Sequence, residues 1–132
     1  MQTVGNEIIL DDTSILVSET DAKGHIVFAD ETFVNVSGYS LDELIGHPHN
    51  IVRHPDMPKA AFKDMWETIQ KGNAWQGFVK NSSKGGKYYW VYATIFPFGD
   101  GHYLSVRKKA SSEEIQKYEA LYRQMCLEEK RS

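Results

Sequence analysis

The fold is decided by the stretch ILVSETDAKGHIVFAD, residues 15–30. The apolar and β-branched residues of 15–20 and 25–29 predict two strands. The segment between them, Asp21-Ala22-Lys23-Gly24, is typical of a turn, because Asp opens turns and Gly adopts φ > 0 without strain. Asp30 then suits the N-cap of a helix. This stretch therefore predicts a β-hairpin that leads directly into a helix.

Short helices joined by an irregular connection are predicted next. A Ser-x-x-Glu capping box at residues 40–43 opens a helix that ends at Gly46. Residues 47–58 hold three prolines, so they form at most a single helical turn. Residues 61–69 carry an apolar stripe at helical spacing, and Gly72 ends that helix.

Three more strands are predicted at residues 75–80, 87–96 and 102–108, which are rich in aromatic and β-branched residues. Two strands, a run of short helices and then three strands indicate an α+β fold. We predict a five-stranded antiparallel sheet with the short helices on one face. A further capping box at residues 111–114 opens a C-terminal helix.

The chain divides into three parts: an N-terminal cap at 1–14, a main domain at 15–109 and a C-terminal helix at 110–132. One side of that helix is apolar and either packs on the domain or pairs with a second copy of the chain. We predict the latter, which makes this a signalling and dimerisation helix and the protein a homodimer. The apolar residues concerned are Ile115, Tyr118, Leu121, Tyr122 and Met125.

The composition is that of one ordinary globular domain, with 132 residues, 41% of them hydrophobic, and a net charge of −3. That charge is unlike the basic surface of a nucleic-acid-binding protein. The single cysteine, Cys126, cannot form an internal disulfide and favours a reducing, cytoplasmic location. The N-terminus lacks the pattern of a signal peptide and no apolar run is long enough to span a membrane, so we expect no membrane contact.

Two blocks of sequence resemble a known family. Residues 21–46 carry the pattern Asp21-x-x-Gly24-x-Ile26-x-x-Ala29-Asp30-x-x-Phe33-x-x-x-Ser37-Gly38-Tyr39, which resembles the first half of a PAS domain. Residues 48–62, PHNIVRHPDMPKAAF, and residues 75–81, WQGFVKN, resemble the Aer-type aerotaxis receptors. The resemblance covers residues 12–125. It implies a PAS sensory domain, not an enzyme, that binds FAD and reports redox, oxygen or energy state to a chemotaxis output domain or chemoreceptor partner.

The same residues suit a flavin on physical grounds. The flavin ring is apolar on its faces and polar along one edge, so it needs aromatic walls and a few placed hydrogen-bond partners. Asn81 can donate and accept toward that edge, and Arg53 suits a phosphate or a ring carbonyl. His54 and Asp56 are expected to hold the loop that covers the pocket. The predicted walls are Trp66, Trp75, Tyr89 and Trp90.

Several of these residues also have a plainer interpretation. Trp66 and Trp75 could be core aromatics, and Asn81 could serve the turn that follows it. Arg53 could pair with Asp56.

Asp30 departs from the family pattern, which usually has Asn at this place. An ionised Asp only accepts hydrogen bonds, so the contact expected with the flavin there is changed. A helix N-cap explains Asp30 without any ligand.

Other classes of site were considered from the histidines and the cysteine. His47-x-His49 and His54 invite a metal site, but no Glu or Cys completes a known ligand pattern, so no metal is predicted. A haem-binding PAS gas sensor would use His54 or His102 as axial ligand. A light-driven cysteine adduct is not expected, because Cys126 is far from the pocket in sequence. A cofactor-free PAS dimerisation module is the main alternative function.

Overall fold

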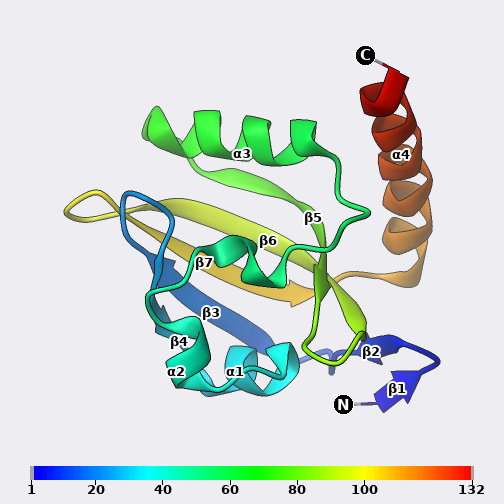
Figure 1. The fold of residues 1–132 in the computed structure, drawn as a ribbon, viewed down its shortest axis with the longest axis horizontal. Coiled ribbons are helices and arrows are strands. Elements are labelled where there is room, and N and C mark those ends of the chain that lie inside the picture. Colours follow the sequence, from blue (N-terminus) through cyan, green and yellow to red (C-terminus); the bar gives the residue numbers. More distant parts are fainter. Residues whose placement is uncertain (1, 132) are drawn as a thin grey trace.

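The computed structural model describes residues 2–131 and shows one twisted sheet with helices on both faces (Figure 1). The strands are β1 (Gln2–Val4), β2 (Glu7–Ile9), β3 (Ile15–Thr20), β4 (Ile26–Ala29), β5 (Trp75–Ser82), β6 (Tyr88–Phe98) and β7 (His102–Lys109). The helices are α1 (Glu31–Ser37), α2 (Leu41–Leu44), the 3-10 helix η1 (His49–Val52), α3 (Lys59–Gln70) and α4 (Ser112–Arg131).

The predicted five antiparallel strands are confirmed, in the order β5-β6-β7-β3-β4. Two further strands, β1 and β2, form a hairpin within the stretch predicted as an N-terminal cap. They join β6 through a single parallel register, Glu7 opposite Tyr88. The sequence did not predict them, because each strand has only three residues and too little pattern to stand out.

The hairpin and the helix it leads into form as predicted. The Asp21 carboxylate accepts hydrogen bonds from the amides of Lys23 and His25, which closes the turn between β3 and β4. Asp30 caps α1 by accepting from the Phe33 amide at 2.8 Å. Gly38 ends α1 with φ of 75°, a conformation that glycine adopts without strain.

The alternation of side chains along β5 and β6 decides what faces the short helices. Asn81 on β5 pairs with Tyr89 on β6, and both side chains point to the face that carries α3. The preceding pair, Lys80 and Trp90, points to the opposite face, because successive strand residues alternate.

The C-terminal helix α4 packs on that opposite face, near the edge strand β5 (Figure 1). The Tyr122 hydroxyl donates to the Phe78 carbonyl at 2.6 Å, and the Tyr118 and Phe78 rings lie 4.5 Å apart. Four of the five apolar residues on this helix thus pack on their own domain: Ile115, Tyr118, Tyr122 and Met125. The fifth, Leu121, stays 45% exposed. No helix within residues 2–131 is long and apolar enough to cross a membrane.

The far end of α4 is tied to the start of α3. The Glu129 carboxylate accepts hydrogen bonds from the amides of Lys59 at 3.0 Å and Ala60 at 2.9 Å. Pro58 at the N-cap of α3 provides no side-chain cap, so a residue from a distant helix satisfies these two amides. The carboxylate also suits the positive end of the helix dipole.

Candidate functional site

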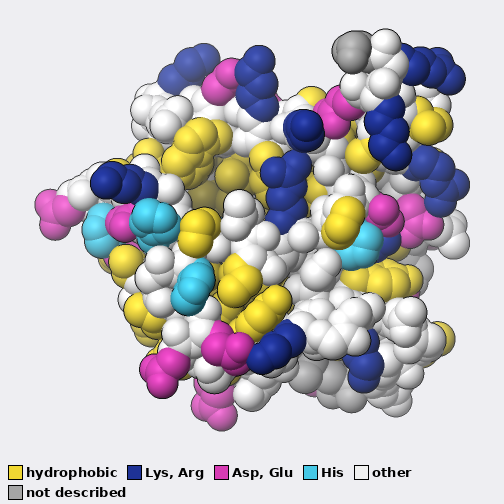
Figure 2. All heavy atoms as spheres, viewed as in Figure 1, with side chains coloured by type: hydrophobic (Ala, Val, Ile, Leu, Met, Phe, Trp, Pro, Cys, Tyr) yellow, Lys and Arg dark blue, Asp and Glu magenta, His cyan; other side chains and the backbone are white. Residues whose placement is uncertain are grey.

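A cavity of about 460 Å³ lies between α3 and the sheet, and we call it the α3 cavity. Its volume is within the range of small-molecule sites. In Figure 2 a hollow below α3 has hydrophobic side chains at its bottom and basic side chains at its edge. The apolar part of the lining comes from Phe62, Met65, Trp66, Ile69, Val79, Ala93, Ile95 and Tyr103, and the polar part from Thr20, Lys23, His49, Asn50, Arg53, Lys63, Asn81, Ser105 and Arg107.

A cluster around Arg107 forms the polar end of the cavity. The Arg107 guanidinium is 3% exposed and donates from Nη2 to Ser18 Oγ and, at 2.7 Å, to His49 Nε2. It also lies 4.7 Å from the centre of the Phe33 ring, on which His49 stacks. Since guanidinium carries five N–H donors, some remain for a ligand.

Burial governs the protonation of this cluster. Loss of solvent lowers the pKa of Arg107 to about 10, so it stays charged at neutral pH. Burial and the neighbouring Arg107 cation lower the pKa of His49 to about 3, so its ring is neutral. Arg107 makes no ion pair with a carboxylate of residues 2–131, which leaves a buried positive charge facing the cavity.

Asn81 and Tyr89 lie side by side at the same end of the sheet. Asn81 lines the cavity and is 4% exposed, so its amide is available in a nearly dry environment. Tyr89 is fully buried beside it but does not line the cavity. Its hydroxyl has no hydrogen-bond partner of good geometry among the described residues, and burial raises the pKa of Tyr89 to about 12.

Two more of the predicted site residues line the cavity. Trp66 projects from α3 and lies 5.5 Å from the Tyr103 ring. Arg53 places its guanidinium 4.2 Å from the centre of the Phe62 ring, and its backbone pairs with that of Asn81. The alternative interpretation, a pairing of Arg53 with Asp56, is not found, because Asp56 pairs with Lys80 instead.

The remaining predicted residues lie outside the α3 cavity. Trp75 donates from Nε1 to Asp64 at 2.9 Å and covers Gly77, where it joins α3 to the sheet. Asp30 caps α1. Trp90, His54 and Asp56 lie at a second hollow.

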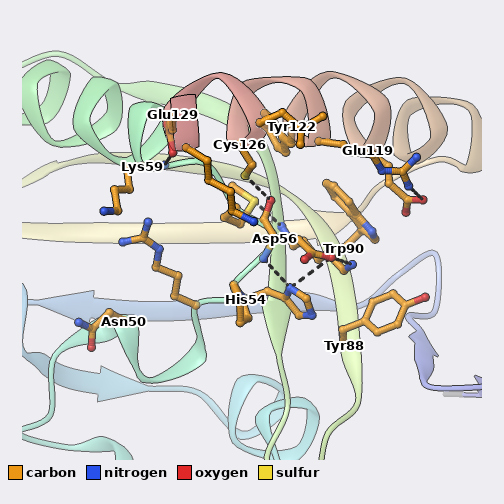
Figure 3. A pocket seen from close by; sticks show the side chains of 17 residues that line it. Asn50, His54, Asp56, Lys59, Tyr88, Trp90, Glu119, Tyr122, Cys126 and Glu129 are labelled. Carbon is orange, nitrogen blue, oxygen red and sulfur yellow. Dashed lines mark hydrogen bonds and ion pairs between the residues drawn. The ribbon is translucent and has the colours of Figure 1, made fainter. Parts of the chain in front are cut away.

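That second hollow, the α4 groove, has a volume of about 1030 Å³ and runs between α4 and the loop before α3 (Figure 3). Asp56 and Lys80 form an ion pair of 2.8 Å in it, and Lys80 holds the pKa of Asp56 below its usual value. His54 Nδ1 accepts from the Asp56 amide, and burial together with Lys80 lowers the pKa of His54. Cys126 of α4 donates to the Asp56 carbonyl.

Arg107 and His49 were not predicted from the sequence. In the predicted strand at 102–108, Ser105 and Arg107 share one face while Leu104 and Val106 share the other. That alternation is a usable signal, but it does not say which face is inside. The sequence pattern around His49 indicates only a candidate metal ligand, and the described residues contain no group of three or more metal-binding side chains.

The fold is that of a PAS domain: the family model described as PAS fold matches residues 26–108. The chain belongs to the PAS family, and within it to the type found in aerotaxis receptors. It is 52% identical over 125 residues to the aerotaxis receptor of Escherichia coli (strain K12), which covers 92% of this chain and 24% of that protein. The chain thus spans about a quarter of the length of that relative.

Another relative and a solved structure are also similar to this chain. The biofilm dispersion protein BdlA of Pseudomonas aeruginosa is 32% identical over 103 residues, which is 76% of this chain and 25% of that protein. Among solved structures, the dark form of the blue-light photoreceptor Aureochrome1 LOV superposes with a TM-score of 0.68 at 24% identity, over 81% of this chain and 80% of that one. The family match and the similarity to a receptor identify the chain as a PAS sensor domain.

Proposed function

We propose that this domain binds a flavin, FAD in particular, in the α3 cavity and reports redox or oxygen state to a chemotaxis output. One observation carries the proposal: Arg107 is a buried cation that lines a largely apolar cavity without a carboxylate partner within residues 2–131. A buried charge is unfavourable unless acceptors or an opposite charge compensate it. The carbonyl and ring-nitrogen acceptors of a flavin edge, between apolar faces, would do so.

Different lining residues would contact the faces and the polar edge of such a ring. Trp66 and Met65 from α3 offer apolar and polarisable contacts to its faces. The Asn81 amide matches an edge that both donates and accepts, and Arg107 supplies charged donors.

A bound flavin supplies a change of charge and protonation at its polar edge when it is reduced. Arg107 stabilises negative charge arising beside it. The same negative charge would raise the pKa of His49 from its depressed value and would attract the Arg107 donors toward the flavin. The hydrogen bonds among Arg107, His49 and Ser18 then rearrange, which is the local event from which a signal can start.

The loop at residues 53–58 links this event to α4. Its first residue, Arg53, lines the α3 cavity and pairs with the backbone of Asn81. Further along, Asp56 binds Lys80 and accepts from Cys126 of α4. The similarity to an aerotaxis receptor supports a chemotaxis output. The proposed cytoplasmic location rests on the single cysteine, Cys126, which cannot form an internal disulfide.

The test is spectroscopic. Purified protein, with FAD added, is expected to show the two broad flavin bands in the blue and near ultraviolet and to melt at a higher temperature than without FAD. A reductive titration against a dye of known potential then shows whether the flavin cycles in a physiological range. A colourless protein whose melting temperature FAD leaves unchanged would refute flavin binding and favour the cofactor-free dimerisation module. A sharp Soret band would identify a haem sensor instead.

A further inference from the structure

We infer that the α4 groove holds the adenosine diphosphate part of FAD, so that the cofactor spans two hollows and contacts α4 directly. This inference rests on the proposed binding of the flavin ring in the α3 cavity. It gives a role to the larger hollow, the α4 groove, which the proposed function does not use.

The two hollows meet at the loop before α3. Asn50 and Arg53 line both of them, and no other residue of the described range 2–131 does. A ligand tail that leaves the α3 cavity past these two residues therefore enters the α4 groove. Arg53 makes no ion pair within residues 2–131, and its guanidinium suits a diphosphate at this junction.

The charge of the groove favours an anion. Five cationic and three anionic side chains line it, which gives a local charge of +2 in a chain whose net charge is −3. Each anion already has a partner: Asp56 binds Lys80, Glu119 lies 3.6 Å from Arg123, and Glu129 caps α3. The cations are Arg53, Lys59, Lys80, Arg123 and Lys130.

A buried donor in the groove suits a heteroaromatic base. Trp90 lines the groove and is 4% exposed, and its indole Nε1 has no hydrogen-bond partner in the described part of the chain. The ring of Trp90 stacks on Tyr122 of α4, with 6.1 Å between centroids and 16° between planes. An adenine ring offers nitrogen acceptors to the indole N–H and a flat face to the aromatic pair.

The consequence concerns α4, whose second half forms one wall of the groove (Figure 3). Tyr122, Arg123, Cys126 and Lys130 all line it from this helix. FAD would therefore contact both the α3 cavity and the C-terminal helix α4, whereas FMN would contact only the α3 cavity. In the α4 groove, the adenosine diphosphate part would connect the flavin ring to α4 by direct contact.

The test compares FAD, FMN and ADP on the same protein freed of cofactor. We expect FAD to bind at least roughly tenfold more tightly than FMN, since the groove adds charge-assisted contacts. The double variant Arg123→Glu/Lys130→Glu should weaken FAD by roughly tenfold and leave FMN unchanged. Lys117→Glu on the outer side of α4 is the matched control and should change neither. Trp90→Phe, which keeps a ring and removes the N–H, should weaken only FAD.

A second readout follows α4 itself. Hydrogen exchange of residues 122–130 should slow with FAD and not with FMN. Equal affinities for FAD and FMN, with no effect of the groove variants, would overturn the inference and leave the flavin proposal intact. Failure of both flavins to bind would overturn the proposed function. If Lys63→Glu at the other rim of the α3 cavity, and not the groove pair, removes the preference for FAD, the tail leaves elsewhere and the inference is wrong. Tight binding of ADP alone without any flavin would mark a free-nucleotide site and also overturn it.

Discussion

The two faces of the sheet formed by β5, β6 and β7 are built from alternating residues of the same strands, yet their buried charges are compensated differently. On the α3 side, Arg107 is buried without a carboxylate partner within residues 2–131. On the α4 side, Lys80 is also buried, and it binds Asp56 at 2.8 Å. A compensated charge stabilises the joint between loop and sheet, whereas an uncompensated one is a place for a ligand. The difference separates the structural face from the binding face.

The largest expected effect comes from removing the uncompensated charge. Arg107→Met should weaken flavin binding by roughly tenfold to a hundredfold, because a hydrogen bond to a charged group contributes about 1.5–3 kcal/mol. The fold should persist, since replacing a buried charge by an apolar side chain is often neutral or stabilising. Fluorescence titration measures the affinity. Lys108→Met, which removes the neighbouring charge on the other face of the sheet, is the control. An equal loss of flavin affinity in both variants would contradict a specific role for the buried charge of Arg107.

A second change tests the packing on the α3 side. A Cβ at Gly77 would lie 2.4 Å from Trp75 Cη2, so Gly77→Ala must displace the indole and its hydrogen bond to Asp64. We expect a loss of about 1–3 kcal/mol in the free energy of unfolding, as for other overpacked cores. Urea denaturation measures it. Gln76→Ala, one residue away and facing outward, should change the free energy of unfolding little. A similar loss there would show that the contact between Gly77 and Trp75 is not the cause.

The pH dependence of stability tests the neutral state of His49. Its folded pKa of about 3 lies below the usual 6.5, so the unfolded chain binds a proton that the folded chain does not. Stability should therefore be full above pH 6.5 and fall as the pH drops below it, by at most about 1.4 kcal/mol per pH unit from this group. His54 adds in the same direction. His49→Gln should flatten the slope between pH 6.5 and 4.5, and an unchanged slope would contradict the burial of a neutral ring.

The smallest effect is expected on the α4 side, where Glu129 caps α3. The amides of Ala60 and Lys59 hold the pKa of Glu129 below its usual value, so its contribution is present above that usual value and is lost as the pH falls through the folded pKa. Glu129→Gln should lower the melting temperature by a few degrees at neutral pH and by less in acid. Glu67→Gln, an exposed carboxylate on α3, is the control. A loss independent of pH would indicate packing and not the charged cap.

Much of the fold could be predicted because its signals are local. The turn at 21–24, the cap at Asp30 and the capping box at 40–43 each act within a few residues, and each is found in the structure. The hairpin of β1 and β2 could not be predicted, since its strands are short and depend on the distant start of β6.

The candidate site was predicted in part. Arg53, Trp66 and Asn81 line the α3 cavity, whereas Trp90 and Asp56 line the α4 groove. Aromatic content suggested that Tyr89 and Trp90 act together, but a strand sends consecutive side chains to opposite faces, so no two neighbours in it can share one wall.

By itself, the sequence of this protein determined the element order, the caps and turns, and the resemblance that pointed to a PAS domain, because these depend on residues close together in the chain. The tertiary structure decided which face of each strand lies inside. It brought His49, Arg107 and Ser18 together from three distant segments, and it placed Glu129 at the start of α3. Burial and charge compensation are properties of such assembled groups, and they exist only once the sheet and helices have packed.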